Sequence, residues 1–382
     1  MKIYLVGGAV RDRLLNIPVK DRDWLVVGAT EEQMLELGYQ RQDGTFPVFR
    51  HPESGEEYAL ARREVKSGTG YKGFEVECGP DVTLEEDLQR RDFTVNALVQ
   101  DEAGQVIDRV GGLADLEERR LKHISPAFVE DPVRLLRAAR FIAKLSKYGF
   151  SLAHDTFKLM KEMATPEEIA ALKPERVWQE MRRALAEPEP WRFFETLQRC
   201  GVLQRLLPSL SLAMSGDLAH GNHEPAESIV ILKRAVTAGA GPEVRFVAMF
   251  APLCKGPGGC NWLSRALPLE RAYLEPLKQL QGLARFYPAA AAGDPAAILD
   301  LLVRGRVRQQ PQRFADLMQA CALVWPQQAP ASADWYAPAI EAMNSVSPAE
   351  LSKEGLQGPD LGRALRERQI GAIAELDQPL DQ

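Results

Sequence analysis

This 382-residue sequence has few cysteines, no long apolar runs and no excess of basic residues. Its apolar runs, such as Trp24–Val27, are far shorter than the ~20 residues that a membrane-spanning helix needs. Five cysteines spread along the chain argue against a disulfide framework and fit a reducing compartment. A net charge of −6 speaks against nonspecific coating of nucleic acid, although it allows a local basic cleft. We therefore expect a cytoplasmic protein that does not associate with a membrane.

The order of predicted elements gives an α+β chain, with a small mixed-sheet head followed by an all-helical remainder. Strands are expected at residues 3–6, 23–28, 57–63 and 105–108. Capping boxes at Thr30 and Thr83 predict two short helices in the same part of the chain. After about residue 125 strand patterns stop, and Asp131-Pro132 predicts the start of a helix that runs to about Leu145.

The segment Asp21-Arg22-Asp23 is the first candidate for chemistry. It opens the second predicted strand, where alternate side chains face the same way, so the two carboxylates are expected side by side. Such groups repel each other unless a cation lies between them, and Mg²⁺ binds a few carboxylates while keeping positions for water and phosphate. A lone Asp-x-Asp is more often a surface turn, so its context decides.

A glycine turn precedes this carboxylate pair. Gly7-Gly8 ends the first predicted strand, and Arg11 lies in the first turn of the helix expected from residue 9. Glycine lets phosphate oxygens approach the backbone, a helix start attracts anions, and an arginine adds a charge-assisted contact. By itself Gly-Gly is compatible with a plain turn. Next to paired carboxylates it favours metal-assisted nucleotidyl transfer.

The sequence of residues 90–98, RRDFTVNAL, combines an apolar stripe with a polar cluster. We expect a short helix that buries its apolar residues and gathers Arg90, Arg91, Asp92 and Asn96 near its start. One interpretation is a solvated helix end with an arginine–aspartate ion pair. The other brings Arg91 to a triphosphate and Asp92 or Asn96 to the ribose hydroxyls, and the sequence weighs the two evenly.

The helix after Asp131 separates an apolar face from an arginine-rich face formed by Arg134, Arg137 and Arg140. Asp131 and Arg134, one turn apart, have the polarity to read a base edge. The carboxylate accepts from the exocyclic amine of C or A, and the guanidinium donates to the ring nitrogen or carbonyl. G and U present an acceptor where that amine would be, so the pair would select C and A without a template. Alternatively, Asp131 merely caps its helix.

In this order and spacing, the four motifs resemble the class II CCA-adding tRNA nucleotidyltransferases of bacterial type, in the polymerase-β-like superfamily. The resemblance is close through about residue 205. It implies the addition of C, C and A to the tRNA 3′ end from CTP and ATP, with release of pyrophosphate. It implies a catalytic head at residues 1–125, a helical neck with the base-reading helix at 126–205, and a helical body and tail at 206–382. The implied partners are tRNA, at its acceptor end and elbow, and the two nucleotides, with no stable protein partner.

The resemblance also assigns roles to individual residues. Asp21 and Asp23 are implied to be catalytic and to hold Mg²⁺, while Asp131 and Arg134 are implied to read the incoming base. The other implied nucleotide-binding residues are Gly8, Arg11, Arg91, Arg137 and Arg140. The glycine-rich stretch at residues 66–73 falls where the family has a flexible loop involved in changing from C to A addition.

One departure concerns the phosphohydrolase (HD) domain of several bacterial relatives, which needs spaced histidines and a His-Asp pair. Around residues 245–256 this chain has no such pair, and His220 and His223 are the only histidines after residue 154. A degenerate HD-like region without metal ligands is therefore expected. Two alternative functions stay open, a poly(A) polymerase of the same superfamily and a partial enzyme that adds only CC or only A. The intact Asp21 and Asp23 disfavour a catalytically dead RNA-binding module.

Overall fold

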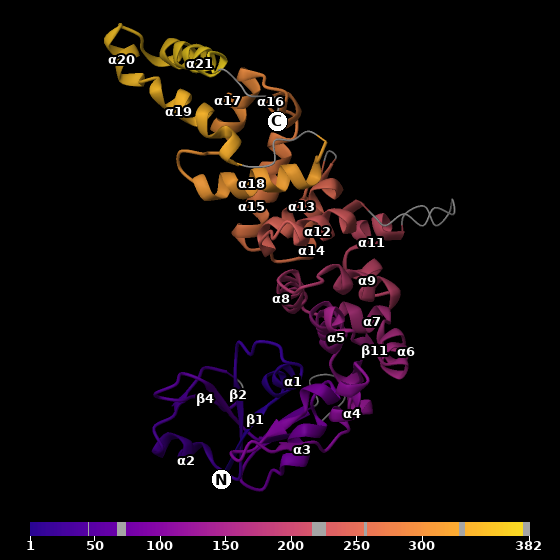
Figure 1. Ribbon diagram of the computed structural model, residues 1–382. Helices are drawn as coiled ribbons and strands as arrows, with labels where there is room; N and C mark the ends of the chain where they lie inside the picture. Colours follow the sequence, from indigo (N-terminus) through magenta and orange to yellow (C-terminus); the bar gives the residue numbers. More distant parts are fainter. Residues whose placement is uncertain (45, 67–73, 216–226, 256–257, 328–332, 377–382) are drawn as a thin grey trace. The chain divides into compact units, whose positions relative to one another are not determined.

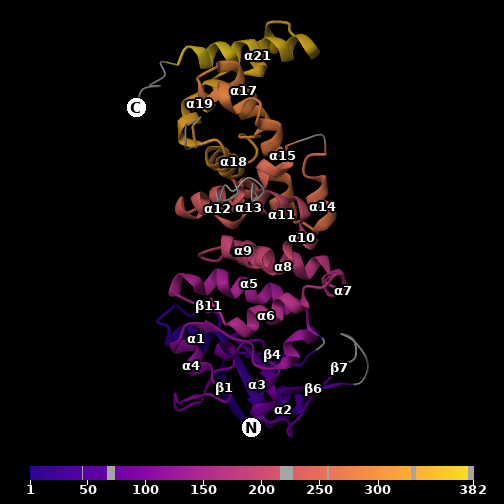
Figure 2. The ribbon, with the colours of Figure 1, turned by 90° about the vertical axis from the view of Figure 1, so that its right-hand side faces the viewer.

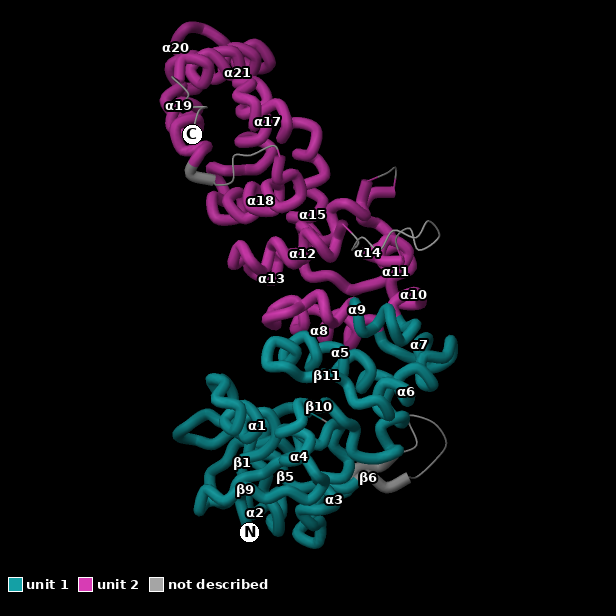
Figure 3. Tube along the Cα trace, turned by 45° about the vertical axis from the view of Figure 1, so that its right-hand side comes forward, with its two compact units in different colours: residues 1–173, 195–202 teal, residues 174–194, 203–382 magenta. Residues whose placement is uncertain are grey.

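The computed structural model describes residues 1–44, 46–66, 74–215, 227–255, 258–327 and 333–376 (Figure 1). The chain forms two compact units, residues 1–173 with 195–202, and residues 174–194 with 203–382 (Figure 3). Within the described part of the chain, every helix is too short or too polar to cross a membrane. Of the glycine-rich stretch expected at residues 66–73, Lys66 is the last residue of a strand, and residues 67–73 lie outside the described residues, as do His220 and His223.

A mixed sheet organises the first unit, as the sequence predicted. Among the described residues its strand order is β3-β4-β5-β2-β1-β8-β9, with β2 parallel to β5 and the other neighbours antiparallel. Two small sheets pair β6 with β7 and β10 with β11. The strands are β1 Lys2–Val6, β2 Asp23–Val27, β3 Gln40–Arg41, β4 Val48–Arg50, β5 Glu57–Leu60, β6 Arg62–Lys66, β7 Phe74–Cys78, β8 Val99–Gln100, β9 Val106–Ile107, β10 Arg120–Leu121 and β11 Ser151–Leu152.

Two strand expectations are wrong in detail. The run predicted at 57–63 is broken at Ala61, which bonds to the Val26 carbonyl, so β5 and β6 belong to different sheets. The expectation that strands stop after residue 125 is contradicted by β11, which pairs in parallel with β10. A two-residue strand is too short to show the alternation by which strands are recognised in a sequence.

The helices of the first unit begin largely where the sequence predicted them. Thr30 and Thr83 each form both hydrogen bonds of a capping box, which confirms the two predicted helix starts. The helix after Asp131-Pro132 is also confirmed and ends at Leu145. The helices are α1 Gly8–Leu14, α2 Glu31–Glu36, α3 Leu84–Gln89, α4 Gly112–Glu117, α5 Val133–Leu145, α6 His154–Met163 and α7 Pro166–Ala170.

The described part of the second unit is helical, and Figure 2 shows its helices from a second side. Helix α13 is at its centre, with α12, α15 and α18 packed against it. The alanine-rich residues 287–297 contain α16 and the start of α17. The helices from here to the C-terminus are α8 Pro174–Leu185, α9 Trp191–Arg199, α10 Leu203–Leu206, α11 Pro208–Ser215, α12 Glu227–Thr237, α13 Pro242–Phe250, α14 Asn261–Ala266, α15 Arg271–Leu283, α16 Tyr287–Ala291, α17 Pro295–Arg304, α18 Pro311–Val324, α19 Ala337–Ser345, α20 Pro348–Lys353 and α21 Gly358–Ala374.

Gly112 allows the start of α4 to approach residues 94–96 closely. A Cβ at this position would lie 2.3 Å from the Thr94 carbonyl oxygen, a distance that only a backbone shift can relieve. We expect Gly112→Ala to lower the free energy of unfolding by ~1–3 kcal/mol, the cost of overpacking. The control is Gly371→Ala in α21, where nothing lies within 4 Å and the helix gains ~0.5–1 kcal/mol. Calorimetric unfolding measures both, and a Gly112→Ala protein as stable as the parent would contradict this packing.

Candidate active site

Three carboxylates influence one another electrostatically at one end of β2. Asp23 is the first residue of the strand, and its partner on the parallel strand β5 is Glu57. Asp21 is exposed and precedes the strand. The prediction that Asp21 and Asp23 lie in one strand with their side chains on the same face is therefore wrong. Asp23 is exposed as a residue, but loss of water around its carboxylate raises its pKa, the Glu57 and Asp21 carboxylates raise it further, and Arg91 lowers it. These four charged groups are therefore electrostatic neighbours.

Glu57 is a neighbour of Asp23 that no pattern in the sequence predicted. It is adjacent to Asp23 only because β5 pairs with β2 across a gap of about thirty residues, and no local pattern announces that pairing. Among the described residues, no three His, Cys, Asp or Glu side chains come close enough to hold a metal ion by themselves. A cation bound here would therefore depend on phosphate or water oxygens as well.

The glycine turn lies against the arginine-rich segment. Gly7 has a φ of +73° and precedes α1, and its N–H donates to the Leu98 carbonyl at 3.0 Å. A Cβ on Gly7 would lie 3.6 Å from Nη1 of Arg91, and a Cβ on Gly8 would lie 3.4 Å from Nη2 of Arg11. Both distances are ordinary van der Waals contacts. Gly7 is favoured by its positive φ and because a Cβ there would also lie 3.3 Å from the Asn96 carbonyl oxygen, whereas the space at Gly8 would admit a Cβ.

Arg11 is buried, with 1% of its surface exposed. Its Nε and Nη2 donate to Oδ1 of Asp12 at 2.8 and 2.7 Å, and its Nη1 donates to Oδ1 of Asn96. The other oxygen of Asp12 accepts from Lys144 Nζ of α5 at 2.7 Å. The guanidinium predicted to contact a phosphate therefore has intramolecular partners that join α1 to residue 96.

Asp92 and Asn96 are buried, so the solvated helix end considered for this segment is wrong. The helix itself is reduced to a 3₁₀ turn at Thr94–Asn96. Asp92 Oδ2 accepts from Nε and Nη2 of Arg137 at 2.7 and 2.6 Å, and its Oδ1 accepts from the Phe93 N–H and from Asn96 Nδ2. Burial raises the pKa of Asp92, but Arg137, Asn96 and Arg134 together outweigh it and hold this pKa below its ordinary value.

The two base-reading candidates have different partners at the start of α5. Asp131 Oδ1 accepts from the Val133 N–H at 2.9 Å, so this carboxylate does cap the first turn. Arg134 donates through Nη1 to the Ala127 carbonyl and through Nη2 to the Arg90 carbonyl, both at 2.9 Å.

Two further arginines of α5 stack near one ring. The guanidinium carbon of Arg140 lies 4.4 Å from the centre of the Phe141 ring, and that of Arg137 lies 5.6 Å from it. The structure therefore gathers Gly8, Arg11, Arg91, Arg134 and Arg137 around residues 90–96, with Arg140 at the neighbouring ring.

Comparison with protein families identifies two segments. Residues 3–122 match the family described as "Poly A polymerase head domain", and residues 149–214 match "Probable RNA and SrmB- binding site of polymerase A". Among solved structures, the chain resembles the CCA-adding enzyme of Bacillus stearothermophilus in complex with CTP, with a TM-score of 0.69 and 24% identity over 97% of this chain and 88% of that one. It also resembles the Thermotoga maritima CCA-adding enzyme complexed with tRNA, with a TM-score of 0.64 and 18% identity over 99% of this chain and 88% of that one. At these identities the likeness establishes the fold.

Similarity in sequence to curated proteins is higher. The chain is 41% identical to the "Multifunctional CCA protein" of Thioalkalivibrio sulfidiphilus and 43% identical to the "CCA-adding enzyme" of Pseudomonas putida, in each case over 98% of both chains. Identity of this order along nearly the whole length of both partners is typical of members of one family. The chain therefore belongs to the family of CCA-adding tRNA nucleotidyltransferases.

Proposed function

We propose that this chain adds C, C and A to the 3′ end of tRNA from CTP and ATP, without a template, and releases pyrophosphate. The observation that supports this function is that Asp21 and Arg91 both act electrostatically on Asp23, while a Cβ on Gly7 of the glycine turn would lie 3.6 Å from the same Arg91. Of the two alternatives, a poly(A) polymerase accounts for the name of the head-domain family. The full-length relatives, however, carry the names of CCA-adding proteins.

Enzymes of this family generally use a divalent metal ion, and the residues present suit Mg²⁺. Carboxylate oxygens are its preferred protein ligands, and the mutual repulsion at Asp21, Asp23 and Glu57 is relieved by a cation. Asp21 and Asp23 would hold the ion, with Glu57 adjacent to Asp23. When bound, Mg²⁺ supplies a Lewis acid that activates the attacking 3′-hydroxyl and neutralises charge on the leaving pyrophosphate.

Further roles follow from the same neighbourhood. Gly8 and Arg91 would approach the triphosphate, because the turn leaves room beside the Arg91 guanidinium. Arg11 and Arg137 would add positive charge while their hydrogen bonds to Asp12, Asn96 and Asp92 fix them in place. Arg140 would complete the pocket. Asp131 and Arg134 would read the edge of the incoming base.

The chain as a whole would hold tRNA at two places. We propose residues 1–125 as the catalytic head and 126–205 as the neck for the acceptor end, with residues 206–382 for the elbow. The solved Thermotoga maritima relative in complex with tRNA supports tRNA as the partner. The described residues of the region around 245–256 form α13 and a 3₁₀ turn at Ala251–Cys254, and we propose a structural role for this degenerate HD-like part. The proposed location is the cytoplasm, and no stable protein partner is proposed.

The carboxylate pair is tested by Asp21→Ala and Asp23→Ala. Loss of either metal ligand removes several kcal/mol of transition-state stabilisation, so each variant should lose at least ~10³-fold in incorporation of both CTP and ATP. The affinity for tRNA should change by less than about threefold, because phosphate contacts elsewhere supply it. Single-turnover incorporation into tRNA lacking CCA, together with filter binding, measures both quantities. The exposed Asp43→Ala is the control, and near-normal turnover by either site variant would refute the assignment.

Base reading is tested by Asp131→Asn, which keeps an oxygen for the Val133 N–H but removes the negative charge. If Asp131 and Arg134 read the base, use of UTP and GTP relative to CTP and ATP should rise by ~5- to 150-fold, the range for one polar pair to a base edge. The melting temperature should not change, because asparagine also caps a helix well. The measurement is kcat/KM for the four nucleotides. An unchanged preference would leave Asp131 with its capping role only.

A further inference from the structure

Asp87 is a carboxylate with no exposed surface that binds two arginines of the segment described above. Its Oδ2 accepts from Nε and Nη2 of Arg91 at 3.1 and 2.9 Å. Its Oδ1 accepts from Nε of Arg90 at 3.0 Å, from Nη2 of the same guanidinium, and from the main-chain N–H of Arg62 at 3.3 Å. One side chain thus receives five hydrogen bonds, four of them from guanidinium groups.

The two arginines lead from Asp87 to the site. Arg91 extends its Nη1 toward Gly7, where a Cβ would be 3.6 Å away, and its charge lowers the pKa of Asp23. The main-chain carbonyl of Arg90 accepts from Nη2 of Arg134, the candidate base reader. Asp87 therefore binds Arg91, the arginine at the glycine turn, directly. It also binds the side chain of Arg90, whose main-chain carbonyl holds Arg134.

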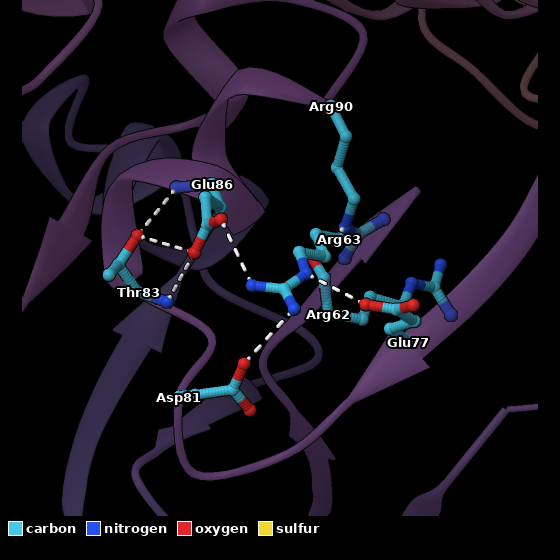
Figure 4. A network of polar contacts seen from close by, with 7 residues as sticks. All are labelled: Arg62, Arg63, Glu77, Asp81, Thr83, Glu86 and Arg90. Carbon is cyan, nitrogen blue, oxygen red and sulfur yellow. Dashed lines mark hydrogen bonds and ion pairs between the residues drawn. The ribbon is translucent and has the colours of Figure 1, made fainter. Parts of the chain in front are cut away.

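Helix α3, which carries Asp87, is anchored independently at its other end. Thr83 and Glu86 form the capping box, and Arg63 bridges Glu77, Asp81 and Glu86 at 2.9, 3.0 and 3.4 Å (Figure 4). Figure 4 also shows Arg90 beside Arg62 and Arg63, at the side of this cluster. The start of α3 does not need Asp87 for its anchorage, so the Asp87 carboxylate serves the end of the helix where the arginines are.

The charges indicate why an aspartate is buried here. Two adjacent guanidiniums repel each other, and a carboxylate between them allows both to keep fixed positions. Burial raises the pKa of Asp87, but Arg91 and Arg90 outweigh it, so its pKa is lowered and the group stays ionised at neutral pH. Two cations against one anion leave a net positive charge, which an added triphosphate can balance.

We propose that Asp87 is a positioning residue for the incoming nucleotide. It holds the Arg91 guanidinium in one orientation at the triphosphate, and through the Arg90 main chain it supports Arg134 at the base. This inference rests on the proposed function, in which Arg91 contacts the nucleotide. A purely structural role would be limited to joining α3 to the main chain of Arg62.

The test is Asp87→Asn, which preserves size and an acceptor for the Arg62 N–H but removes the charge between the arginines. Loss of charge-assisted hydrogen bonds to Arg91 should raise KM for both CTP and ATP by at least about tenfold, with a smaller fall in kcat. Arg91→Gln should raise KM similarly, and the double variant should stay within about twofold of Arg91→Gln, because both changes remove one interaction. Glu85→Gln is the matched control on α3, since Glu85 is exposed and its ion pair with Arg109 lies at the surface, and the KM of this variant should not change.

The outcomes separate this inference from the proposed function. If Arg91→Gln raises KM but Asp87→Asn does not, or if the two effects multiply in the double variant, the positioning role is refuted while the function of Arg91 stands. If Arg91→Gln leaves KM unchanged, both fail. Should Asp87→Asn not fold, Arg91→Lys decides, because lysine keeps the charge without the two-pronged geometry. A KM like that of Arg91→Gln supports orientation by Asp87, and a KM like that of the parent refutes it.

Discussion

Buried ion pairs between aspartates and arginines are the constraint on which the rest of the first unit depends. Asp12, Asp87 and Asp92 are all nearly or fully buried, and each binds at least one arginine or lysine directly. An unpaired carboxylate would cost several kcal/mol in such surroundings, so each acid requires its cation to stay in place. Asp12 joins α1 to α5, Asp92 joins residue 92 to α5, and Asp87 holds the two arginines that follow α3, so contacts that stabilise the fold also arrange the site.

This arrangement suits a substrate with several negative charges. The cations of the cluster outnumber its three carboxylates, although the whole chain carries a net charge of −6. Guanidiniums held by buried partners need little reorganisation when a triphosphate arrives, and fixed donors stabilise developing charge better than mobile ones. The carboxylates of Asp21, Asp23 and Glu57 lie at the edge of this cluster, where Arg91 partly offsets their repulsion.

Local patterns allowed much of this structure to be predicted. The capping boxes at Thr30 and Thr83 and the amphipathic α5 depend on residues three or four positions apart, and all three were recognised. The relation of Asp87 to Arg90 and Arg91 has the same spacing and could have been recognised too. Glu57 could not, because its place beside Asp23 depends on a strand pairing that no local pattern encodes. The burial of Arg11 and Asp92 could not be predicted either, because their partners Asn96 and Arg137 come from distant segments of the chain.

The central claim is that the carboxylates at β2 and the fixed arginines form one nucleotide site. A crystal soaked with CTP and Mn²⁺, with Mn²⁺ located by its anomalous scattering, tests this claim most directly. The account predicts a metal peak between Asp21 and Asp23, the triphosphate beside Gly8 and Arg91, and unchanged ion pairs from Asp87 to Arg91 and from Asp92 to Arg137. A metal bound away from Asp21 and Asp23, or an Arg91 that leaves Asp87 to reach the nucleotide, would contradict it.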